Sequence, residues 1–304
     1  MPSKSHTALG RRNMRRHTFE IYRGQDMYPD ETMLHHHDFY EINMILTGNL
    51  AYAVESRNYV LEAGDVLLVG PMELHQPFLN SSEQKFERYV LWIDKTYLQQ
   101  YTQLGFELAR CFDPAYSDCS NVISLDGMSK QYLIFLMEQL QIESESEEFA
   151  SELCAQTYLV QLLVTLNRMA RQQPKNLEIK DKSSSVVTGV LNYINSHYSE
   201  DLSLDLLANM FFISKYHLAR EFSRLVGTSV YRYIIQKRLA IAKQLMSEGV
   251  PSTTVFQQCG FGDYSNFYRA FKTEYGISPK EYMAHLREAA LQNEENGRVI
   301  REHL

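Results

Sequence analysis

Residues 260–279 read GFGDYSNFYRAFKTEYGISP, and this stretch repeats an arrangement that begins with Ser214, about fifty residues earlier. Each copy predicts a short helix, a tight turn and a second helix. Two helix-turn-helix units in one chain indicate DNA binding. Three residues of the first unit match three of the second at one constant spacing: Leu218, Arg220 and Phe222 against Phe267, Arg269 and Phe271.

Capping residues predict where the helices of these units begin and end. Ser203 and Ser214 stand where an N-cap would start each helix of the first unit, and Asp263 does so for the second helix of the second unit. Gly227 predicts a left-handed C-cap. The second helices are therefore expected at 214–226 and 264–275. On the first of these, we expect three side chains spaced i, i+4 and i+7 to be buried: Leu218, Phe222 and Leu225.

The remaining polar side chains of the two second helices are the candidate contacts to DNA. Such a helix reads base edges with its first residues and contacts phosphates farther along. The alternative is that these residues only form a solvated helix face; the duplicated unit favours the DNA interpretation. The candidates are Lys215, Tyr216, His217, Arg220 and Arg224 in the first unit, and Ser265, Asn266, Tyr268, Arg269 and Lys272 in the second.

A single helix from about residue 230 to 246 is predicted to join the two units. Its expected buried positions are Tyr233, Arg238, Ala242 and Leu245. The first helix of the second unit is expected at 255–259. If both second helices enter major grooves on one side of a duplex, they should lie one turn apart, about 34 Å.

Charge is distributed unevenly along the chain. The formal net charge is −7, with 30 Lys and Arg against 37 Asp and Glu. Between Ser183 and Arg287 there are 11 basic and 8 acidic residues, a net of +3, so the rest of the chain carries −10. Because affinity for phosphate depends on local charge, the C-terminal third is the candidate DNA-binding part.

Composition excludes several classes of protein. A chain of 304 residues can hold two domains with cores of their own. No run of about 18 apolar residues predicts a membrane span. The basic N-terminal segment is not followed by an apolar stretch, so we expect no secretory signal. The four cysteines form no CxxC pair, which favours a reduced cytoplasm over a disulfide scaffold.

The N-terminal half predicts a different architecture. Residues 19 to about 94 alternate short apolar runs with turn signals, which is typical of a small all-β sandwich or barrel. From about Met128 the apolar period becomes helical, with one stripe at Leu133, Leu136 and Leu140. A second stripe comprises Leu159, Leu162, Leu163, Leu166 and Met169. These helices are expected to cover the open face of the barrel.

The predicted domain boundaries follow from these changes of pattern. We expect an N-terminal arm at 1–18, a β-rich sensor domain with flanking helices at 19–172, and a polar linker at 173–184. An all-α domain of two helix-turn-helix units follows at 185–288, and a polar tail at 289–304.

The C-terminal region resembles the AraC/XylS family of bacterial transcription regulators over about 100 residues. Two positions depart from the family pattern: Phe256 replaces a small Ala, and Met283 stands where an Arg is common. The residues that carry the resemblance are Leu204, Ala208, Ser214, Leu218, Phe222, Gly227, Tyr233, Arg238, Ala242, Gly260, Phe261, Ser265, Phe267, Phe271, Lys272, Gly276, Ser278, Pro279 and Tyr282.

The N-terminal half resembles the cupins. Their two motifs place His35, His37, Glu41 and His75 in metal-ligand positions. On a regular strand His35 and His37 would point the same way, with His36 and Asp38 facing away. Three imidazoles and one carboxylate suit Fe, Mn, Ni or Zn. The second motif is imperfect, because residues 71–74 lack the usual glycine, and the AraC resemblance implies a barrel without metal. We therefore expect no metal and no cofactor.

A small organic effector is the expected occupant of the barrel instead. A polar, sugar-type metabolite is favoured over a more apolar one, and the pocket residues expected for it are His35, His37, Glu41, Tyr52, His75 and Trp92.

These resemblances imply a cytoplasmic, ligand-responsive transcription regulator that works as a homodimer with DNA and RNA polymerase and is not an enzyme. Two alternatives stay open: a metal-dependent cupin enzyme fused to a DNA-binding module, and a regulator whose barrel only dimerises. The sequence identifies neither the effector nor the operator, and it does not decide between activation and repression.

Overall fold

The computed structural model describes residues 14–25, 34–78, 86–113, 120–171 and 185–288. The chain divides into two compact units, Met1–Thr188 (unit 1) and Gly189–Leu304 (unit 2). The predicted linker at 173–184 and the predicted tail at 289–304 lie outside the described residues, as does the predicted arm except for residues 14–18. None of the described helices combines the length and the apolar character that crossing a membrane requires.

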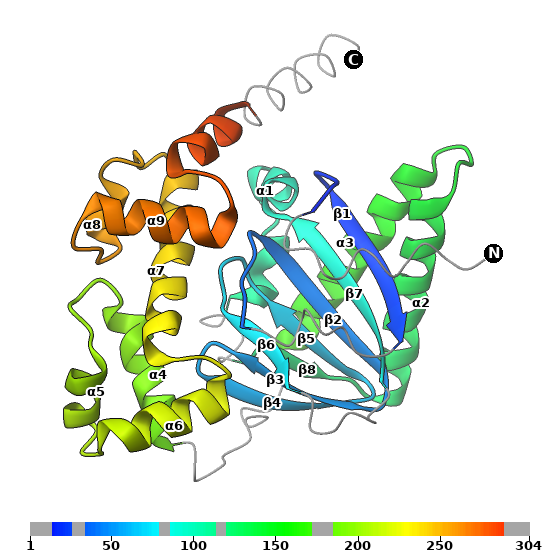
Figure 1. Ribbon diagram of the computed structural model, residues 1–304. Helices are drawn as coiled ribbons and strands as arrows, with labels where there is room; N and C mark the ends of the chain where they lie inside the picture. Colours follow the sequence, from blue (N-terminus) through cyan, green and yellow to red (C-terminus); the bar gives the residue numbers. More distant parts are fainter. Residues whose placement is uncertain (1–13, 26–33, 79–85, 114–119, 172–184, 289–304) are drawn as a thin grey trace. The chain divides into compact units, whose positions relative to one another are not determined.

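Unit 1 contains two antiparallel sheets, as the alternating pattern of residues 19–94 predicts (Figure 1). One sheet holds Phe19–Gln25 (β1), Phe39–Thr47 (β2), Asp65–Val69 (β5), Glu87–Asp94 (β7) and Val122–Ser124 (β8), in the order β1-β7-β2-β5-β8. The other holds Asn49–Val54 (β3), Arg57–Glu62 (β4) and His75–Phe78 (β6), in the order β4-β3-β6. No ladder between described residues joins the two sheets, so the cupin-like barrel is open.

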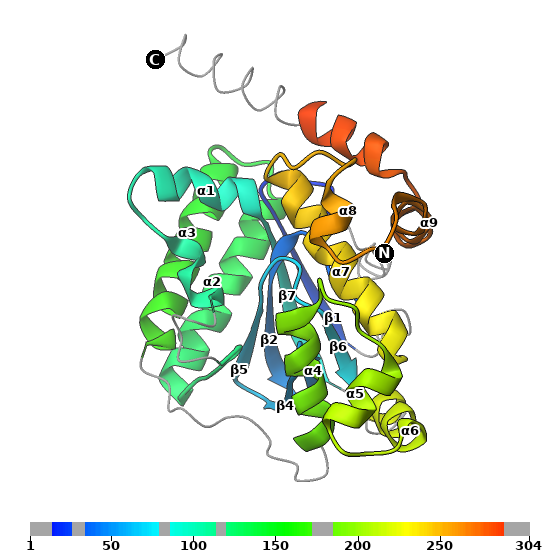
Figure 2. The ribbon, with the colours of Figure 1, turned by 90° about the vertical axis from the view of Figure 1, so that its left-hand side faces the viewer.

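Helices cover one face of the larger sheet (Figures 1 and 2). They are Lys95–Gln103 (α1), the 3₁₀ turn Leu108–Phe112 (η3), Gly127–Glu145 (α2) and Ser151–Ala170 (α3). Both predicted helical stripes lie in this core except at Met169, which is only partly buried. From the sheet, Ile42, Met44, Leu91 and Ile93 pack against the helices.

The opposite face of this sheet points toward the smaller sheet. Ile45, Leu67 and Val69 form a second cluster with residues of the smaller sheet, including Tyr52 and Leu61. Side chains alternate between the two faces of a strand, so Glu41 and Asn43 on β2 face the same interior as Ile45. On β7, Arg88, Val90 and Trp92 do so for the same reason. The interior of the open barrel therefore receives polar as well as apolar side chains.

The histidine segment before β2 is not a regular strand, contrary to expectation. His35 forms only an isolated bridge with His75, and β2 begins at Phe39. His36, expected to face away from its neighbours, is buried, whereas His35 is partly exposed. The chain makes this bend because Met72 N–H donates to the His37 carbonyl and the His35 backbone bonds to His75.

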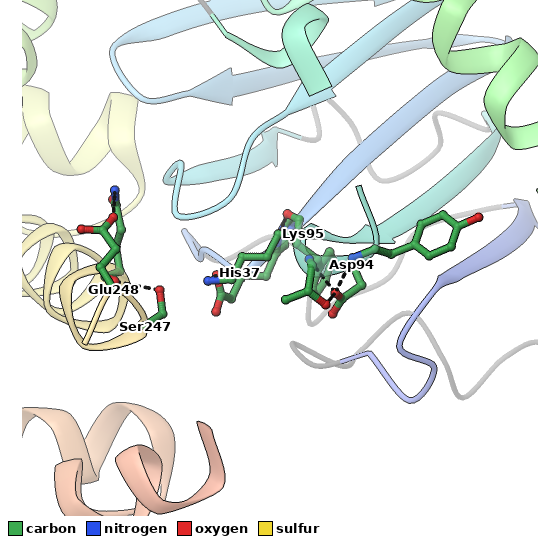
Figure 3. A network of polar contacts seen from close by, with 10 residues as sticks. His37, Asp94, Lys95, Ser247 and Glu248 are labelled. Atoms are coloured by element: carbon green, nitrogen blue, oxygen red, sulfur yellow. Dashed lines mark hydrogen bonds and ion pairs between the residues drawn. The ribbon is translucent and has the colours of Figure 1, made fainter. Parts of the chain in front are cut away.

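Local hydrogen bonds fix the junction between β7 and α1 (Figure 3). The Asp94 carboxylate accepts from the backbone N–H groups of Thr96 and Tyr97, at 2.8 and 3.2 Å, and so caps α1. The neighbouring Lys95 pairs with Asp38 at 2.8 Å. This pair ties the start of α1 to the residue just before β2.

Unit 2 consists of helices (Figure 1). They are Ser185–His197 (α4), Leu204–Met210 (α5), Lys215–Val226 (α6), Val230–Ser247 (α7), Val255–Gln258 (α8) and Tyr264–Tyr275 (α9); residues 279–288 are also helical. The predicted N-caps are confirmed: Ser203, Ser214 and Asp263 accept from Leu206, His217 and Asn266 N–H. Gly227 ends α6 with a φ of 70°.

The buried faces of unit 2 depart from expectation at a few positions. On α6, Leu218 and Phe222 are buried as predicted, but Val226 takes the third place and Leu225 is only partly buried. At 3.6 residues per turn, Phe222 lies at the centre of the buried arc and Leu225 at its edge. On α7, Tyr233 and Ala242 are buried, whereas Arg238 and Leu245 are partly exposed.

Arg238 has a structural role on α7. Its guanidinium donates to the Tyr198 and Glu200 carbonyl oxygens, at 2.7 and 2.6 Å, after α4 ends. Phe256, which replaces the small Ala of the family pattern, is partly buried beside the core of the second helix-turn-helix unit. Its ring lies edge-on to Tyr264. The larger side chain is thus accommodated by an aromatic contact.

Gly260 occupies the turn between α8 and α9, at a point where the chain passes close to Ser199. Its φ of +79° lies in the left-handed region, and a Cβ there would stand 2.7 Å from the Ser199 backbone. Gly262, two residues later, would have no atom within 4 Å of an added Cβ, and its φ is not positive. The turn therefore requires glycine at 260 and not at 262.

We expect Gly260→Ala to lower the free energy of unfolding of unit 2 by roughly 2–4 kcal/mol, because backbone atoms must move apart at a strained φ. Urea unfolding of the full chain, followed by helical circular dichroism, measures the loss. Gly262→Ala is the matched control and should stay within about 1 kcal/mol of the parent protein. Equal stabilities for the two variants would contradict the close approach.

Candidate functional site

Glu41 is the centre of a polar cluster in the interior of unit 1. It lies directly opposite Trp92 in the ladder between β2 and β7. One carboxylate oxygen, Oε2, accepts from Trp92 Nε1 at 2.8 Å and lies 3.2 Å from His37 Nε2. The other, Oε1, accepts from Asn43 Nδ2 at 2.6 Å. Every one of these residues is less than one-tenth exposed.

The cluster continues to Arg88, which the sequence analysis did not anticipate. Arg88 Nη1 donates to Asn43 Oδ1 at 2.9 Å, and the guanidinium lies 5.6 Å from the centre of the Phe86 ring. Arg88 is only 2% exposed. Asn43 was also missed. The signal that could have found both is their spacing, because Asn43 follows Glu41 by two residues on one strand and Arg88 precedes Trp92 by four on another.

His37 and His75 face each other across this cluster, with ring centres 4.7 Å apart. His37 Nδ1 lies 2.9 Å from the Phe39 carbonyl and His75 Nδ1 lies 2.8 Å from the Glu73 carbonyl. Because a carbonyl can only accept, each Nδ1 carries a proton. In a neutral His75 ring, Nε2 is then an acceptor.

Electrostatics give Glu41 and His75 opposite charge states. Burial by itself would raise the pKa of Glu41, but the contact with His37 and the hydrogen bond from Asn43 outweigh it and hold this pKa below its ordinary value. Burial, together with the neighbouring His35 and His37, lowers the pKa of His75 well below its usual range. At neutral pH the site therefore contains a carboxylate and a neutral imidazole.

The structure brings most of the predicted ligand residues together. His37, Glu41, His75 and Trp92 belong to the cluster; the Tyr52 ring stacks at 6.2 Å from that of His75. His35 lies at the edge, 4.2 Å from the His75 ring. Among the described residues, His37, Glu41 and His75 form a group whose ligand atoms lie within 4.8 Å of one another, so these three could hold a metal. His35 does not belong to that group.

The candidate DNA residues of unit 2 lie on exposed helix faces, except for Tyr268, which is partly buried. On α6 the three cations each contact an acid: Lys215 with Asp205, and both Arg220 and Arg224 with Glu221. Tyr216 beside them is 79% exposed. On α9, Arg269 bonds instead to neutral groups, Asn266 Oδ1 at 2.6 Å and the Ser265 carbonyl at 3.4 Å. The cations of α6 are therefore partly neutralised by acids, whereas the charge of Arg269 on α9 is not.

We expect acid to destabilise unit 1 through His75. The unfolded chain takes up a proton below the usual histidine pKa of about 6.5, whereas the folded site holds His75 neutral. The folded state thus binds fewer protons, and stability falls as pH decreases from about 7 to 5, by up to about 1.4 kcal/mol per pH unit. Thermal unfolding of the full chain across this range measures the slope.

His75→Gln should flatten this pH dependence, because it removes the group that titrates. His285→Gln, which removes an exposed histidine of unit 2, is the control and should leave the slope unchanged. If the His75 variant kept the slope of the parent protein, another group would be responsible.

Comparison with known proteins assigns both units. The family model for the AraC-like ligand binding domain matches residues 18–163, and a helix-turn-helix domain model matches residues 207–285. The transcriptional activator RhaS of Enterobacter sp. (strain 638) is 26% identical over 259 residues, which cover 85% of this chain and 89% of RhaS. RhaS of Escherichia coli K12 is 26% identical over 248 residues, covering 81% and 86%.

Among solved structures, ToxT from Vibrio cholerae is 15% identical, with a TM-score of 0.36 and coverage of 88% of this chain and 98% of ToxT. The two family models place a ligand-binding domain in unit 1 and a helix-turn-helix domain in unit 2, and RhaS aligns with most of the chain. The chain therefore belongs to the AraC family of transcription regulators, with a ligand-binding domain followed by a helix-turn-helix DNA-binding domain.

Proposed function

We propose that this regulator activates transcription in response to a polar small metabolite, of the sugar type, which binds the interior of unit 1. The observation that carries the proposal is the polar cluster around Glu41. Its carboxylate, the Asn43 amide and the Arg88 guanidinium offer acceptors and donors suited to hydroxyl groups, and Trp92 offers an aromatic face. Activation is proposed because the RhaS relatives are named activators.

Coupling between effector and DNA requires that the effector binds one arrangement of the chain more tightly than another. Glu41 contacts three parts of the chain: the segment before β2 through His37, β2 through a hydrogen bond from Asn43, and β7 through a hydrogen bond from Trp92. An effector that takes over one of these hydrogen bonds changes how the strands are held together. We propose this exchange as the origin of the response.

The proposed DNA readers are the exposed residues of α6 and α9. Tyr216 and Arg220 on α6, and Asn266 and Arg269 on α9, lie within the first two turns, where base contacts are made. Lys215, His217 and Arg224 in the first unit, with Ser265, Tyr268 and Lys272 in the second, are proposed to contribute base or phosphate contacts.

A homodimer is proposed through the outer face of α2. Met128, Tyr132, Phe135 and Ile142 follow one another at helical spacing and are 83%, 44%, 48% and 58% exposed. An apolar stripe of this kind is typical of a helix that packs against a partner. RNA polymerase is the proposed second protein partner, and the cytoplasm the proposed location.

We propose no catalytic activity and no resident metal. The metalloenzyme alternative has one observation in its favour, the convergence of His37, Glu41 and His75. Against it, both Glu41 oxygens already accept hydrogen bonds from Asn43 and Trp92. Elemental analysis of protein purified without chelator decides between the two: stoichiometric Fe, Mn, Ni or Zn that disappears in His75→Gln would establish the metal site.

We expect Arg220→Ala and Arg269→Ala each to weaken specific binding by about 1–3 kcal/mol, because a bidentate contact to guanine is lost. The measurement is the affinity for an operator selected by the parent protein from a random-sequence library. Arg287→Ala, which removes an exposed arginine outside both reading helices, should have little effect. Parent-like binding by both reading-helix variants would disprove the assignment of these faces.

Trp92 provides a direct measurement of effector binding, because it is the one tryptophan in the sequence and bonds to Glu41. Titration with a panel of sugars and related metabolites should give a saturable change in its fluorescence for the effector. Glu41→Gln should weaken that binding by about 1.5–3 kcal/mol, the usual value of a hydrogen bond to a charged group.

Glu152→Gln, which alters an exposed glutamate of the same unit, is the control for this experiment. Equal affinity in the Glu41 and Glu152 variants would place the effector elsewhere. A panel without any fluorescence change or stabilisation against heat would favour a barrel that only dimerises.

A further inference from the structure

Unit 2 contains a cleft of about 520 Å³ between the connecting helix α7 and the second reading helix α9. One wall comprises the first three turns of α7, including Tyr231, Arg232 and Arg238; the other includes Asn266, Arg269 and Thr273 of α9. Its ten lining residues include three arginines and no acidic residue. Only the α9 wall contains proposed base readers.

We propose that this cleft holds the sugar-phosphate backbone of the duplex that α6 and α9 read, with Arg232 as its phosphate contact. The proposal rests on the function proposed for α9. Half or more of the hydrogen bonds in protein–DNA complexes go to phosphate and sugar, and such contacts orient the protein without reading sequence. Neither reading helix contains Arg232, so the repeat in the sequence gave no reason to select it.

Continuity with the reading helix points to DNA as the occupant. Asn266 and Arg269 line the cleft and also belong to the exposed face of α9. A base edge in contact with Arg269 therefore brings its own phosphates close to the mouth of the cleft. The opposite wall begins at Tyr231, which is 75% exposed and immediately follows the residue that starts α7.

Charge also favours a polyanion. Arg269 bonds only to neutral groups. Arg238 donates to two backbone carbonyls, and Asp201, the acid whose charge acts on it, is not among the residues that line the cleft. Arg232 contacts Glu274 through Nη2 alone, and no described residue bonds its Nε or Nη1. The Arg232 side chain is 47% exposed, whereas that of Glu274 is 4% exposed. Glu274 thus holds the guanidinium in place while the exposed edge stays open to a phosphate oxygen.

The test compares the salt dependence of DNA binding in full-length variants. Arg232→Ala alone would leave the nearly buried Glu274 carboxylate without its partner. It is therefore combined with Glu274→Gln, and Glu274→Gln alone is the reference. Each protein binds its selected operator and a mixed-sequence duplex over a series of salt concentrations. Melting temperatures confirm that the variants are folded.

We expect the double variant to lower the slope of log K against log salt by about 0.9 on both duplexes, the value of one lost phosphate contact. Between 50 and 200 mM salt its affinity should therefore fall about threefold less than that of the reference. Arg232→Lys should keep most of the slope, because a lysine also neutralises a phosphate.

Lys280→Ala is the matched control, since it removes one exposed positive charge of unit 2 outside the cleft. An equal slope change in Lys280→Ala would show a net-charge effect and overturn the proposal, as would an unchanged slope in the double variant. In either case, operator binding that still depends on Arg220 and Arg269 would leave the proposed reading function intact. Loss of operator binding with an unchanged slope on mixed-sequence DNA would make Arg232 a base reader, which also overturns the phosphate assignment.

Discussion

The burial of one carboxylate, that of Glu41, constrains the interior of unit 1. A charge removed from water is tolerated only where hydrogen bonds replace its hydration. Trp92 and Asn43 donate these hydrogen bonds, and the His37 ring lies 3.2 Å from the same carboxylate. The register of β2 against β7, the bend of the histidine segment and the position of the single tryptophan are therefore parts of one arrangement. A ligand that enters this interior has to replace or share these bonds, which links binding to the packing of the strands.

The larger sheet separates two environments. Its outer face meets the leucines of α2 and α3 in a dry core, where burial of apolar surface stabilises the unit. Its inner face carries Glu41, Asn43, Arg88 and Trp92 among apolar neighbours. The same strands thus provide a rigid support on one side and a chemically specific surface on the other, an arrangement suited to holding polar groups in place.

The two halves of unit 2 share a fold but differ in charge. Both second helices begin at a side-chain cap, bury aromatic or aliphatic residues on one face and end at a glycine with positive φ. On α6, however, the cations are opposed by Asp205 and Glu221, whereas Arg269 on α9 bonds only to neutral groups. In the adjoining cleft, Arg232 pairs with Glu274. Exposed ion pairs are weak, so α6 can still exchange an acid for a phosphate. Of the two helix-turn-helix units, the second therefore attracts a polyanion more strongly.

Much of this protein followed from local pattern. The repeat around Ser214 and Asp263, the caps, the glycines and the helical stripes of the N-terminal half depend on neighbouring residues along the chain, and these predictions are confirmed. Motif spacing also singled out His37, Glu41 and His75, which the structure brings together. Trp92, expected in the pocket without a motif, lies in the same cluster.

Other features depend on contacts between distant segments, which spacing does not record. The irregular histidine segment is set by hydrogen bonds to residues 72 and 75. Asn43 and Arg88 become site residues only when β2 and β7 pair, and Arg232 lines a cleft only when α7 packs beside α9. The sequence by itself determined the repeated helices of the C-terminal half and their caps, because those depend on short-range periodicity and residue type, and its motifs carried the resemblance to a family of regulators. Only the tertiary structure decided which polar side chains meet, because that depends on strand register and helix packing between residues far apart in the chain.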